Sequence, residues 1–474
     1  MKTRYRILFA ALALLQAGCS DFVDLNPPTI VRQDQYFKTQ ADFAAAVNGL
    51  YSGLRGYYAN FYLFAEIPSD NSEVNGYNLA NADLDQLTWL TNTASIQTLW
   101  LSSYSTIARA NIILDRIDAV PMDATIKEQF KGEARFVRAL MYFNLVQFFG
   151  EVPLPLREIT TEDEAYAYTR ESTGKVYQQI QLDLQDAIKA LPPGYDAANK
   201  GKATKGAAMG LLGKVYITNK QFAEGAAILK TLIESNNYTL LEKYEDVFRV
   251  DNSFNNEILF NVHYLGNGNS EGSNFSIAFA PFGSGTEITS GGNPAGSNQG
   301  TLDLFNAFET GDNRKNVSIA RYPSSGDLYT RKFLDKPIAN NEGNNDWPVL
   351  RYADVLLLYA EALNETGSSS EAVQPLNQVR KRAGLTGLTV ASQAQLRELI
   401  QKERRVELCF EGHRWLDLLR TRQMLPVMTR YKENYKGKAY LVEYYEVDER
   451  KYRFPIPFRE RSLNPALTQN EGYN

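Results

Sequence analysis

The sequence predicts a mainly α-helical fold in which helix hairpins are joined by long irregular loops with few short strands. Apolar residues recur at steps of three and four within residues 41–54, 95–117 and 131–150, as expected when one face of a helix is buried. This periodicity is lost in residues 251–348, which are rich in Gly, Asn and Ser. A segment of that length without a regular pattern is either disordered or a functional loop region, and its interleaved aromatic residues favour functional loops.

Two later segments have the spacing of tetratricopeptide-like helix hairpins. In residues 205–234, Gly213 and Ala226 stand where the two helices of such a repeat approach closely, and Ala360 has a similar place in residues 351–384. Small residues are needed there because larger ones would push the helix axes apart. Chance similarity between two Ala-rich helical hairpins is the alternative interpretation, and the spacing favours the repeat.

The N-terminus has the pattern of an export signal. Three basic residues precede an apolar run, so residues 1–18 are predicted to be a signal peptide, too short to span a bilayer as a mature helix. The order apolar run, Ala-Gly, Cys resembles the lipobox of bacterial lipoproteins and predicts acylation of Cys19. Residues 19–40, with Asn26-Pro27-Pro28, are then a lipidated N-terminus and an extended tether. An ordinary secreted protein with an incidental Cys19 is the alternative.

Composition excludes several classes of function. The net charge of the chain is −5, and removal of three basic residues with the signal peptide leaves about −8, so nucleic acid is not an expected partner. The mature chain keeps two histidines, His263 and His413, and one cysteine after Cys19, Cys409, too few for a zinc site. No nucleophile-elbow pattern is present, and 55 acidic residues make carboxylate pairs uninformative. We therefore predict no catalytic residue, no metal and no cofactor.

The stretch ERRVELCFEGHRWLDLLR, residues 403–420, is the most suggestive of catalysis. Glu407, Glu411 and His413 resemble the parts of a hydrolytic site. Acidic and basic residues nevertheless alternate there at spacings that allow ion pairs within and between helices, with Gly412 expected to break the stretch into two helices. We therefore interpret it as a scaffold in which His413 is a structural, hydrogen-bonded residue.

Several phrases in sequence order resemble the SusD/RagB family of outer-membrane lipoproteins from Bacteroidota. They are CSDFVDLNPP, LWLSSYSTIARANIIL, GEARFVRALMYFNLVQFFGEVPLP, WPVLRYADVLLLYAEALNE, RRVELCFEGHRWLDLLR and FPIPFRERSLNPALTQNEGY. The resemblance implies a SusD-like helical fold with an N-terminal helical region over residues 41–250. It also implies a C-terminal SusD/RagB region over residues 251–474, which includes the loop segment 251–348.

The resemblance also implies a function and a location. Family members are not enzymes: they bind oligosaccharides or peptides and act as partners and lids of SusC-like TonB-dependent transporters. The protein is therefore expected in the outer membrane, held by its lipid anchor and facing the cell exterior. Asp21 and Asp24 are the two acidic residues just after Cys19, fewer than surface-exported lipoproteins of these bacteria often carry. The outward orientation thus follows from the family and not from the export signal.

A sugar receptor needs exposed aromatic planes beside amides and carboxylates, because sugar rings present flat apolar faces bordered by hydroxyls. Residues 55–78 supply that mixture, and the family places ligand contacts in the loops that follow the first long helix, up to residue 92. The expected contacts there are Tyr57, Tyr58, Asp70, Asn71, Tyr77, Asn78, Trp89 and Asn92. Trp89 is the preferred platform for a sugar ring. Tyr57, Tyr58 and Trp89 could instead fill the helical core, whereas Trp100 has the helical spacing of a core residue.

A second candidate surface lies in the Gly- and Asn-rich loops. It includes Tyr264 and Phe282, and these loops could contact either the ligand or the transporter. Glycines such as Gly283, Gly285 and Gly292 would let them rearrange when a lid closes.

The sequence thus predicts a cell-surface lipoprotein that binds a nutrient and delivers it to a SusC-like TonB-dependent transporter. An oligosaccharide is the favoured ligand. A peptide-binding RagB-like receptor is the alternative among binding proteins. A glycoside hydrolase and a pure helical-repeat scaffold are the competing classes.

Overall fold

The computed structural model describes residues 36–74, 81–290, 292–337, 342–389, 392–434 and 445–473. Several predictions lie outside these residues: the signal peptide 1–18, Cys19, most of the tether 19–40, Tyr77 and Asn78. No helix among the described residues is both long enough and apolar enough to cross a membrane.

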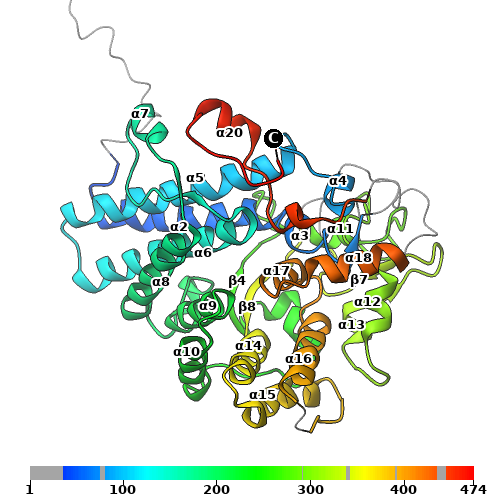
Figure 1. Ribbon diagram of the computed structural model, residues 1–474. Helices are drawn as coiled ribbons and strands as arrows, with labels where there is room; N and C mark the ends of the chain where they lie inside the picture. Colours follow the sequence, from blue (N-terminus) through cyan, green and yellow to red (C-terminus); the bar gives the residue numbers. More distant parts are fainter. Residues whose placement is uncertain are drawn as a thin grey trace, which may run out of the picture.

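Four long helices form the N-terminal part of the described chain. They are α2 (Gln40–Tyr58), α5 (Ala94–Arg116), α6 (Ala124–Phe149) and α8 (Thr173–Ala190). Helix α2 begins with a capping box, in which Thr39 and Asp42 each accept a hydrogen bond from the other's backbone N–H. Helix α6 begins at the cap Asp123 and ends at Gly150, whose φ of +75° closes the helix. Because α6 packs against α2, α5 and α8, much of its surface is buried (Figure 1).

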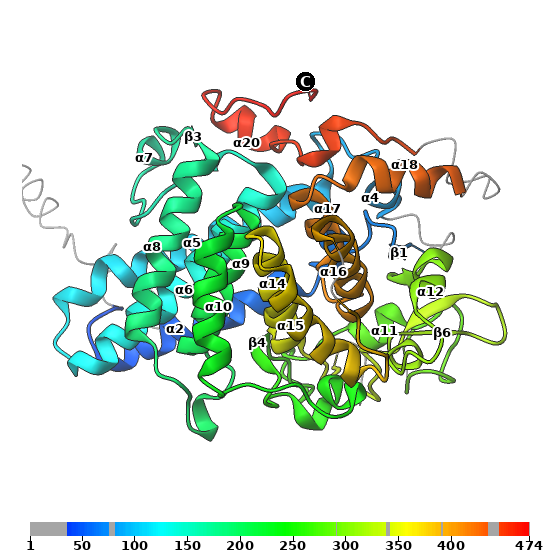
Figure 2. The same ribbon diagram turned by 60° about the horizontal axis from the view of Figure 1, so that its bottom comes forward.

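The two predicted helix hairpins are present. They are α9 (Lys205–Thr218) with α10 (Phe222–Glu234), and α14 (Tyr352–Glu365) with α15 (Ser369–Arg382). A Cβ atom on Gly213 would lie 2.3 Å from Leu229 Cδ2, so the close approach of α9 and α10 requires the glycine. Helix α16 (Gln393–Glu407) packs on α14, and the hairpins stand side by side with α8 (Figure 2). The prediction of a mainly α fold with such hairpins is confirmed.

Strands are few and short, as predicted. One antiparallel pair joins β4 (Ile258–Val262) to β8 (Trp347–Arg351), and β8 leads directly into α14. The other strands are β2 (Val152–Pro153) paired with β3 (Arg170–Glu171), and a sheet in the order β1 (Ser72–Glu73), β5 (Gln299–Gly300), β7 (Leu328–Thr330) and β6 (Ile319–Arg321). The last sheet ties the loop after α2 to the Gly- and Asn-rich region.

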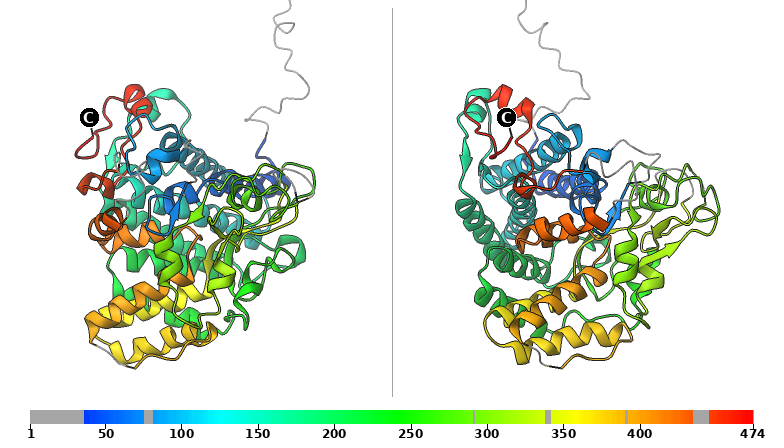
Figure 3. Two further views of the ribbon diagram at one scale, coloured as in Figure 1. Left: turned by 90° about the vertical axis from the view of Figure 1, so that its right-hand side faces the viewer. Right: turned by 45° about the vertical axis from the view of Figure 1, so that its right-hand side comes forward.

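Short helices and single turns complete the described part of the chain. The α-helices are α3 (Tyr62–Ala65), α4 (Ala82–Asp85), α7 (Glu162–Tyr166), α11 (Phe275–Phe279), α12 (Leu302–Ala307), α13 (Lys315–Ser318), α17 (Arg414–Arg420), α18 (Met424–Asn434) and α20 (Phe458–Leu463). The 3₁₀ turns are η3 (Ile117–Ala119), η4 (Ala197–Asn199), η5 (Tyr244–Phe248), η6 (Val250–Asn252) and η7 (Glu449–Tyr452). In the right-hand view of Figure 3, α11 to α13 and their loops, drawn in green shades, gather on one side of the helical body.

The stretch 403–420 forms the centre of a buried ionic network. Gly412, with φ of +77°, lies between α16 and α17, as predicted. Arg351 Nη1 lies 2.6 Å from Glu407 Oε1, and Arg351 Nε lies 2.6 Å from Glu411 Oε2. Although burial alone would raise their pKa values, the neighbouring arginines hold the pKa values of Glu407 and Glu411 below the ordinary range. The carboxylates of Glu407 and Glu411, which suggested catalysis, therefore form structural ion pairs.

His413 and Trp100 are interior residues, as predicted. His413 Nδ1 lies 2.9 Å from Lys214 Nζ, and burial, reinforced by Lys214, lowers the pKa of His413 to about 3. The imidazole is therefore neutral and accepts a hydrogen bond from the lysine. Trp100 packs edge to face on Phe149 with the ring centres 5.0 Å apart.

Candidate functional site

Six of the ten predicted ligand contacts lie in the protein interior. They are Tyr57, Tyr58, Asp70, Asn71, Trp89 and Tyr264. The prediction of Trp89 as an exposed platform is corrected by its surroundings: 1% of the residue is exposed, and its Nε1–H donates to Tyr473 Oη at 2.7 Å. Its ring packs edge to face on Phe454 at 4.9 Å, and Lys451 Nζ lies 5.0 Å from its centre. A sugar ring has no free face of Trp89 on which to stack.

Asp70 and Asn71 hold a loop to the helices behind it. Asp70 accepts from Arg414 Nε at 2.7 Å, and Asn71 Oδ1 accepts from Arg405 Nε at 2.8 Å. Burial would raise the pKa of Asp70, but Arg405 and Arg414 hold it well below its usual range. The Asp70 carboxylate and Asn71 Oδ1 are already paired, and both residues are buried, which corrects the expectation that they face a ligand.

The three tyrosines are buried for different reasons. Tyr57 and Tyr58 pack edge to face at 5.1 Å, and Tyr58 Oη accepts from Asn144 Nδ2 at 3.3 Å. Tyr264 Oη donates to the carbonyl oxygen of Arg55 at 2.6 Å, which ties the loop region to the end of α2. For Tyr57 and Tyr58, this packing supports the alternative interpretation, in which they fill the helical core.

Two predicted contacts are exposed in the described loops. Asn92 lies at the surface just before α5, and Phe282 is 46% exposed after α11. Gly283 and Gly285 follow with φ values of +72° and +53°, a backbone conformation that favours glycine. Asn92 and Phe282 therefore remain predicted ligand contacts.

A cleft that the sequence did not predict runs between α2, the loop from Tyr195 to Thr204, and β4. It consists of two adjoining hollows of 510 Å³ and 280 Å³. Both hollows are lined by Lys200, Gly201, Lys202, Phe260 and Asn261. Gly201 has a φ of +93°, and a Cβ atom there would lie 3.1 Å from the Phe254 ring. The glycine therefore lets the loop pass close to the wall of the cleft.

The larger hollow combines polar groups from α2 and from the segment that follows β4. Arg55 Nη2 lies 2.8 Å from Glu271 Oε1, so these two charges compensate each other. His263 Nδ1 lies 2.9 Å from Asp346 Oδ1, and its ring packs on Phe254 at 4.8 Å. This pairing fixes the orientation of the imidazole at the rim of the hollow.

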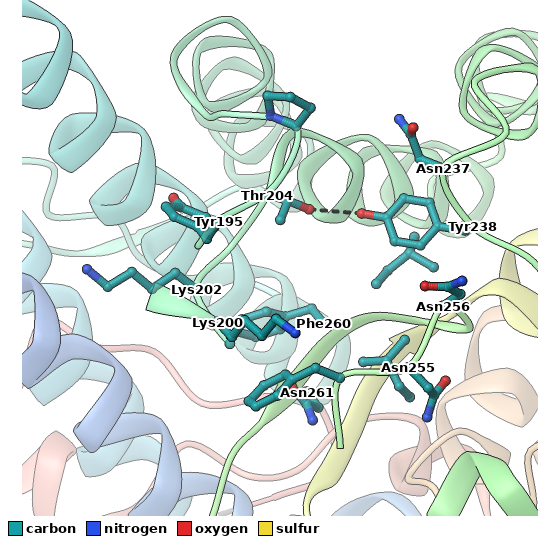
Figure 4. Close-up of a pocket in the computed structure, with 15 residues that line it drawn as sticks. Tyr195, Lys200, Lys202, Thr204, Asn237, Tyr238, Asn255, Asn256, Phe260 and Asn261 are labelled. Atoms are coloured by element: carbon teal, nitrogen blue, oxygen red, sulfur yellow. Dashed lines mark hydrogen bonds between the residues drawn. The ribbon is translucent and has the colours of Figure 1, made fainter. Parts of the chain in front are cut away.

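The smaller hollow is rich in aromatic rings and amides (Figure 4). Tyr195, Tyr238 and Phe254 are half-buried, so part of each residue remains accessible. Thr204 Oγ1 and Tyr238 Oη lie 3.0 Å apart, which fixes the Tyr238 ring. The exposed side-chain amides of Asn237 and Asn256 form no hydrogen bond with another described side chain or backbone group, so they are available to a ligand.

The chemistry of the cleft suits non-covalent binding. Half-buried rings offer apolar planes, whereas the amides and the two lysines offer hydrogen-bond partners for hydroxyl groups. Glu271 is the one carboxylate among the described residues that line the cleft, whereas glycoside hydrolysis uses a pair. The described residues also contain no cluster of three metal-binding side chains. The cleft was not predicted because three segments that are distant in the sequence build it. Asn-rich runs such as DNSFNNE were the one sequence feature that pointed to a polar surface there.

A mainly α scaffold of helix hairpins that carries a polar and aromatic cleft defines a class of ligand-binding helical proteins. Two family models match this chain: the SusD family over residues 323–473, and starch-binding proteins associating with the outer membrane over residues 21–217. Together they match more than half of the chain. The protein belongs to the SusD/RagB family.

Individual relatives match along nearly their whole length. The SusD-like protein P25 of Formosa agariphila is 26% identical, over 100% of this chain and 99% of its own. The starch-binding protein SusD of Bacteroides thetaiotaomicron is 24% identical over 100% of both chains. The solved structure of a laminarin-binding SusD-like protein superposes with a TM-score of 0.80 at 27% identity, covering 92% of this chain and 100% of that chain. The predicted SusD-like fold is thereby confirmed.

Proposed function

We propose that this protein is an outer-membrane lipoprotein that binds an oligosaccharide at the cell surface and delivers it to a SusC-like TonB-dependent transporter. The observation that carries the proposal is the cleft with its half-buried rings and available amides. Relatives named for starch and laminarin binding support the choice of a glycan over a peptide.

The dimensions and the lining of the cleft fit a short saccharide. Pockets for small ligands commonly have volumes of about 300–1,000 Å³, and the two hollows of 510 Å³ and 280 Å³ adjoin. A sugar ring can place its C–H face on Tyr238 while its hydroxyls reach Asn237 and Asn256. Lys200 adds a donor on the opposite wall.

The loop surface around Phe282 offers a second contact for the same glycan. Phe282 is 46% exposed, and the two glycines after it adopt left-handed conformations. A long saccharide could contact both surfaces, so variants in each are needed to locate the ligand.

Replacing Tyr238 by alanine is expected to weaken glycan binding about tenfold, because the sugar loses its stacking surface. A glycan array first identifies a bound saccharide, and isothermal titration calorimetry then compares the wild type, Tyr238→Ala and Phe282→Ala. Tyr216→Ala is the matched control, since Tyr216 is also half-buried but its hydroxyl accepts from Gln185 outside the cleft. Loss of binding in Phe282→Ala alone would move the site to the loops, and unchanged binding in both variants would refute both locations.

Replacing Cys19 by alanine is expected to release the protein from the membrane fraction. The reason is that the acyl chains on this cysteine would supply the membrane affinity, at roughly 0.8 kcal/mol for each buried methylene. Cell fractionation followed by immunoblotting measures the change, with Cys409→Ala as the control cysteine, which is buried in the core. Retention of the Cys19→Ala protein in the membrane would contradict the lipid anchor.

A further inference from the structure

A second pocket, away from the cleft, is lined by cations. It has a volume of 220 Å³ and lies between the end of α6, the start of α8, the end of α9 and the segment after α17. Arg420, Arg422 and Arg453 line it, and no Asp or Glu occurs among the described lining residues. It shares no lining residue with the cleft.

Two of these arginines have no compensating carboxylate among the residues that the structure describes. Arg420 is paired with Glu361 at 2.5 Å and with Asp417 at 2.7 Å. In contrast, Arg453 Nη1 donates to the Tyr452 carbonyl oxygen at 2.7 Å, and Arg422 lies over the Tyr452 ring at 4.7 Å. Neither Arg422 nor Arg453 forms an ion pair with a described carboxylate.

The positive charges of Arg422 and Arg453 are electrostatically unfavourable when the pocket holds no anion. Burial lowers the pKa of Arg453, Tyr177 partly offsets this effect, and the positive charge of Arg422 adds to the lowering. Two guanidinium groups that face one pocket repel each other, and a bound anion would relieve this repulsion. The arrangement therefore favours a negatively charged occupant.

Neutral donors complete the lining. Thr218 Oγ1 is buried and has no hydrogen-bond partner among the described residues. Burial raises the pKa of Tyr177 well above its ordinary value, so its hydroxyl stays protonated, and it donates to no described residue. Thr173 also lines the pocket and is the first residue of the 18-residue helix α8, whose N-terminus adds positive potential.

We propose that this pocket is a binding site for an oxyanion, namely a sulfate, phosphate or carboxylate group. Arginine suits such groups because its planar fork donates two parallel hydrogen bonds. A volume of 220 Å³ is several times the roughly 30 Å³ that one water occupies, so a tetrahedral oxyanion fits with its hydration. The anion could be free in solution or a substituent of an acidic saccharide. The inference does not depend on glycan binding in the cleft.

Calorimetric titration with sodium sulfate tests the site, with sodium chloride added to keep the ionic strength constant. Wild-type protein is expected to bind sulfate, and Arg422→Gln and Arg453→Gln are each expected to weaken binding by roughly 10- to 100-fold, the effect of losing a charged hydrogen bond. Arg459→Gln removes an exposed arginine outside the pocket and should leave binding unchanged. Because Arg422 is exposed, its variant tests the site even if Arg453→Gln fails to fold.

A second titration distinguishes the two sources of the anion. A sulfated oligosaccharide that binds more tightly than inorganic sulfate, and loses that advantage in Arg422→Gln, identifies a saccharide substituent. Equal affinities for both identify a free anion. Absence of sulfate binding to the wild type, or binding that is equal in the wild type and Arg422→Gln, would overturn the proposal.

Discussion

Arg351→Ala is expected to lower the free energy of unfolding by about 3–5 kcal/mol. Arg351 is 1% exposed and contacts three buried carboxylates, those of Glu257, Glu407 and Glu411, at 2.6 to 2.9 Å. Removing the guanidinium leaves these charges without their main partner in the interior, and burial of an unpaired charge is costly. Urea unfolding followed by circular dichroism measures the change.

A surface ion pair provides the control for Arg351. Arg397 Nε lies 2.6 Å from Glu365 Oε1, but its side chain is 40% exposed, so Arg397→Ala should cost about 0–1 kcal/mol. Similar losses in both variants would contradict the assignment of residues 403–420 as a structural centre.

The same network gives the pH dependence a definite sign. The pKa values of Glu407 and Glu411 are lower in the folded protein than in the unfolded chain, where they are about 4.3. Their contribution to stability is therefore present above pH of about 4.3 and is lost as the pH falls below it. Wild-type protein should show this acid loss of stability.

Trp89→Ala is expected to lower the free energy of unfolding by about 3–5 kcal/mol, because it leaves a large cavity between Phe454 and Trp415. Trp89→Phe keeps most of the volume but loses the hydrogen bond to Tyr473, so it should cost less and still fold. Glycan affinity in Trp89→Phe should equal that of the wild type, measured by calorimetry. If either variant kept the stability of the wild type but lost glycan binding, Trp89 would be a ligand contact and not a core residue.

Local patterns were sufficient to predict much of the fold. Apolar periodicity located α5 and α6, and the spacing of Gly213 located the α9–α10 hairpin, since both signals depend on neighbours along one helix or one turn. Alternating charges in residues 403–420 predicted ion pairs for the same reason. Arg314 donates to Glu403 and Glu407, and Arg351 donates to Glu407 and Glu411. These partners could not be predicted, because they come from segments 50 or more residues away.

The site was harder to predict because burial depends on what covers a residue. Trp89 is covered by Tyr473, which lies 384 residues further along the chain, and composition alone did not distinguish this from an exposed ring. The cleft likewise depends on α2, the loop around Gly201 and β4 meeting in space. An aromatic and amide-rich composition predicted the kind of binding surface that the structure contains but not its position.

Calorimetric titration of the purified protein with saccharides selected on a glycan array, followed by chromatography of the recovered saccharide, tests whether the protein is a non-covalent glycan receptor. We expect saturable binding to a defined oligosaccharide, weakened about tenfold by Tyr238→Ala, with the saccharide recovered intact. Shortened saccharide after incubation, or absence of binding to every glycan on the array, would contradict a non-covalent glycan receptor.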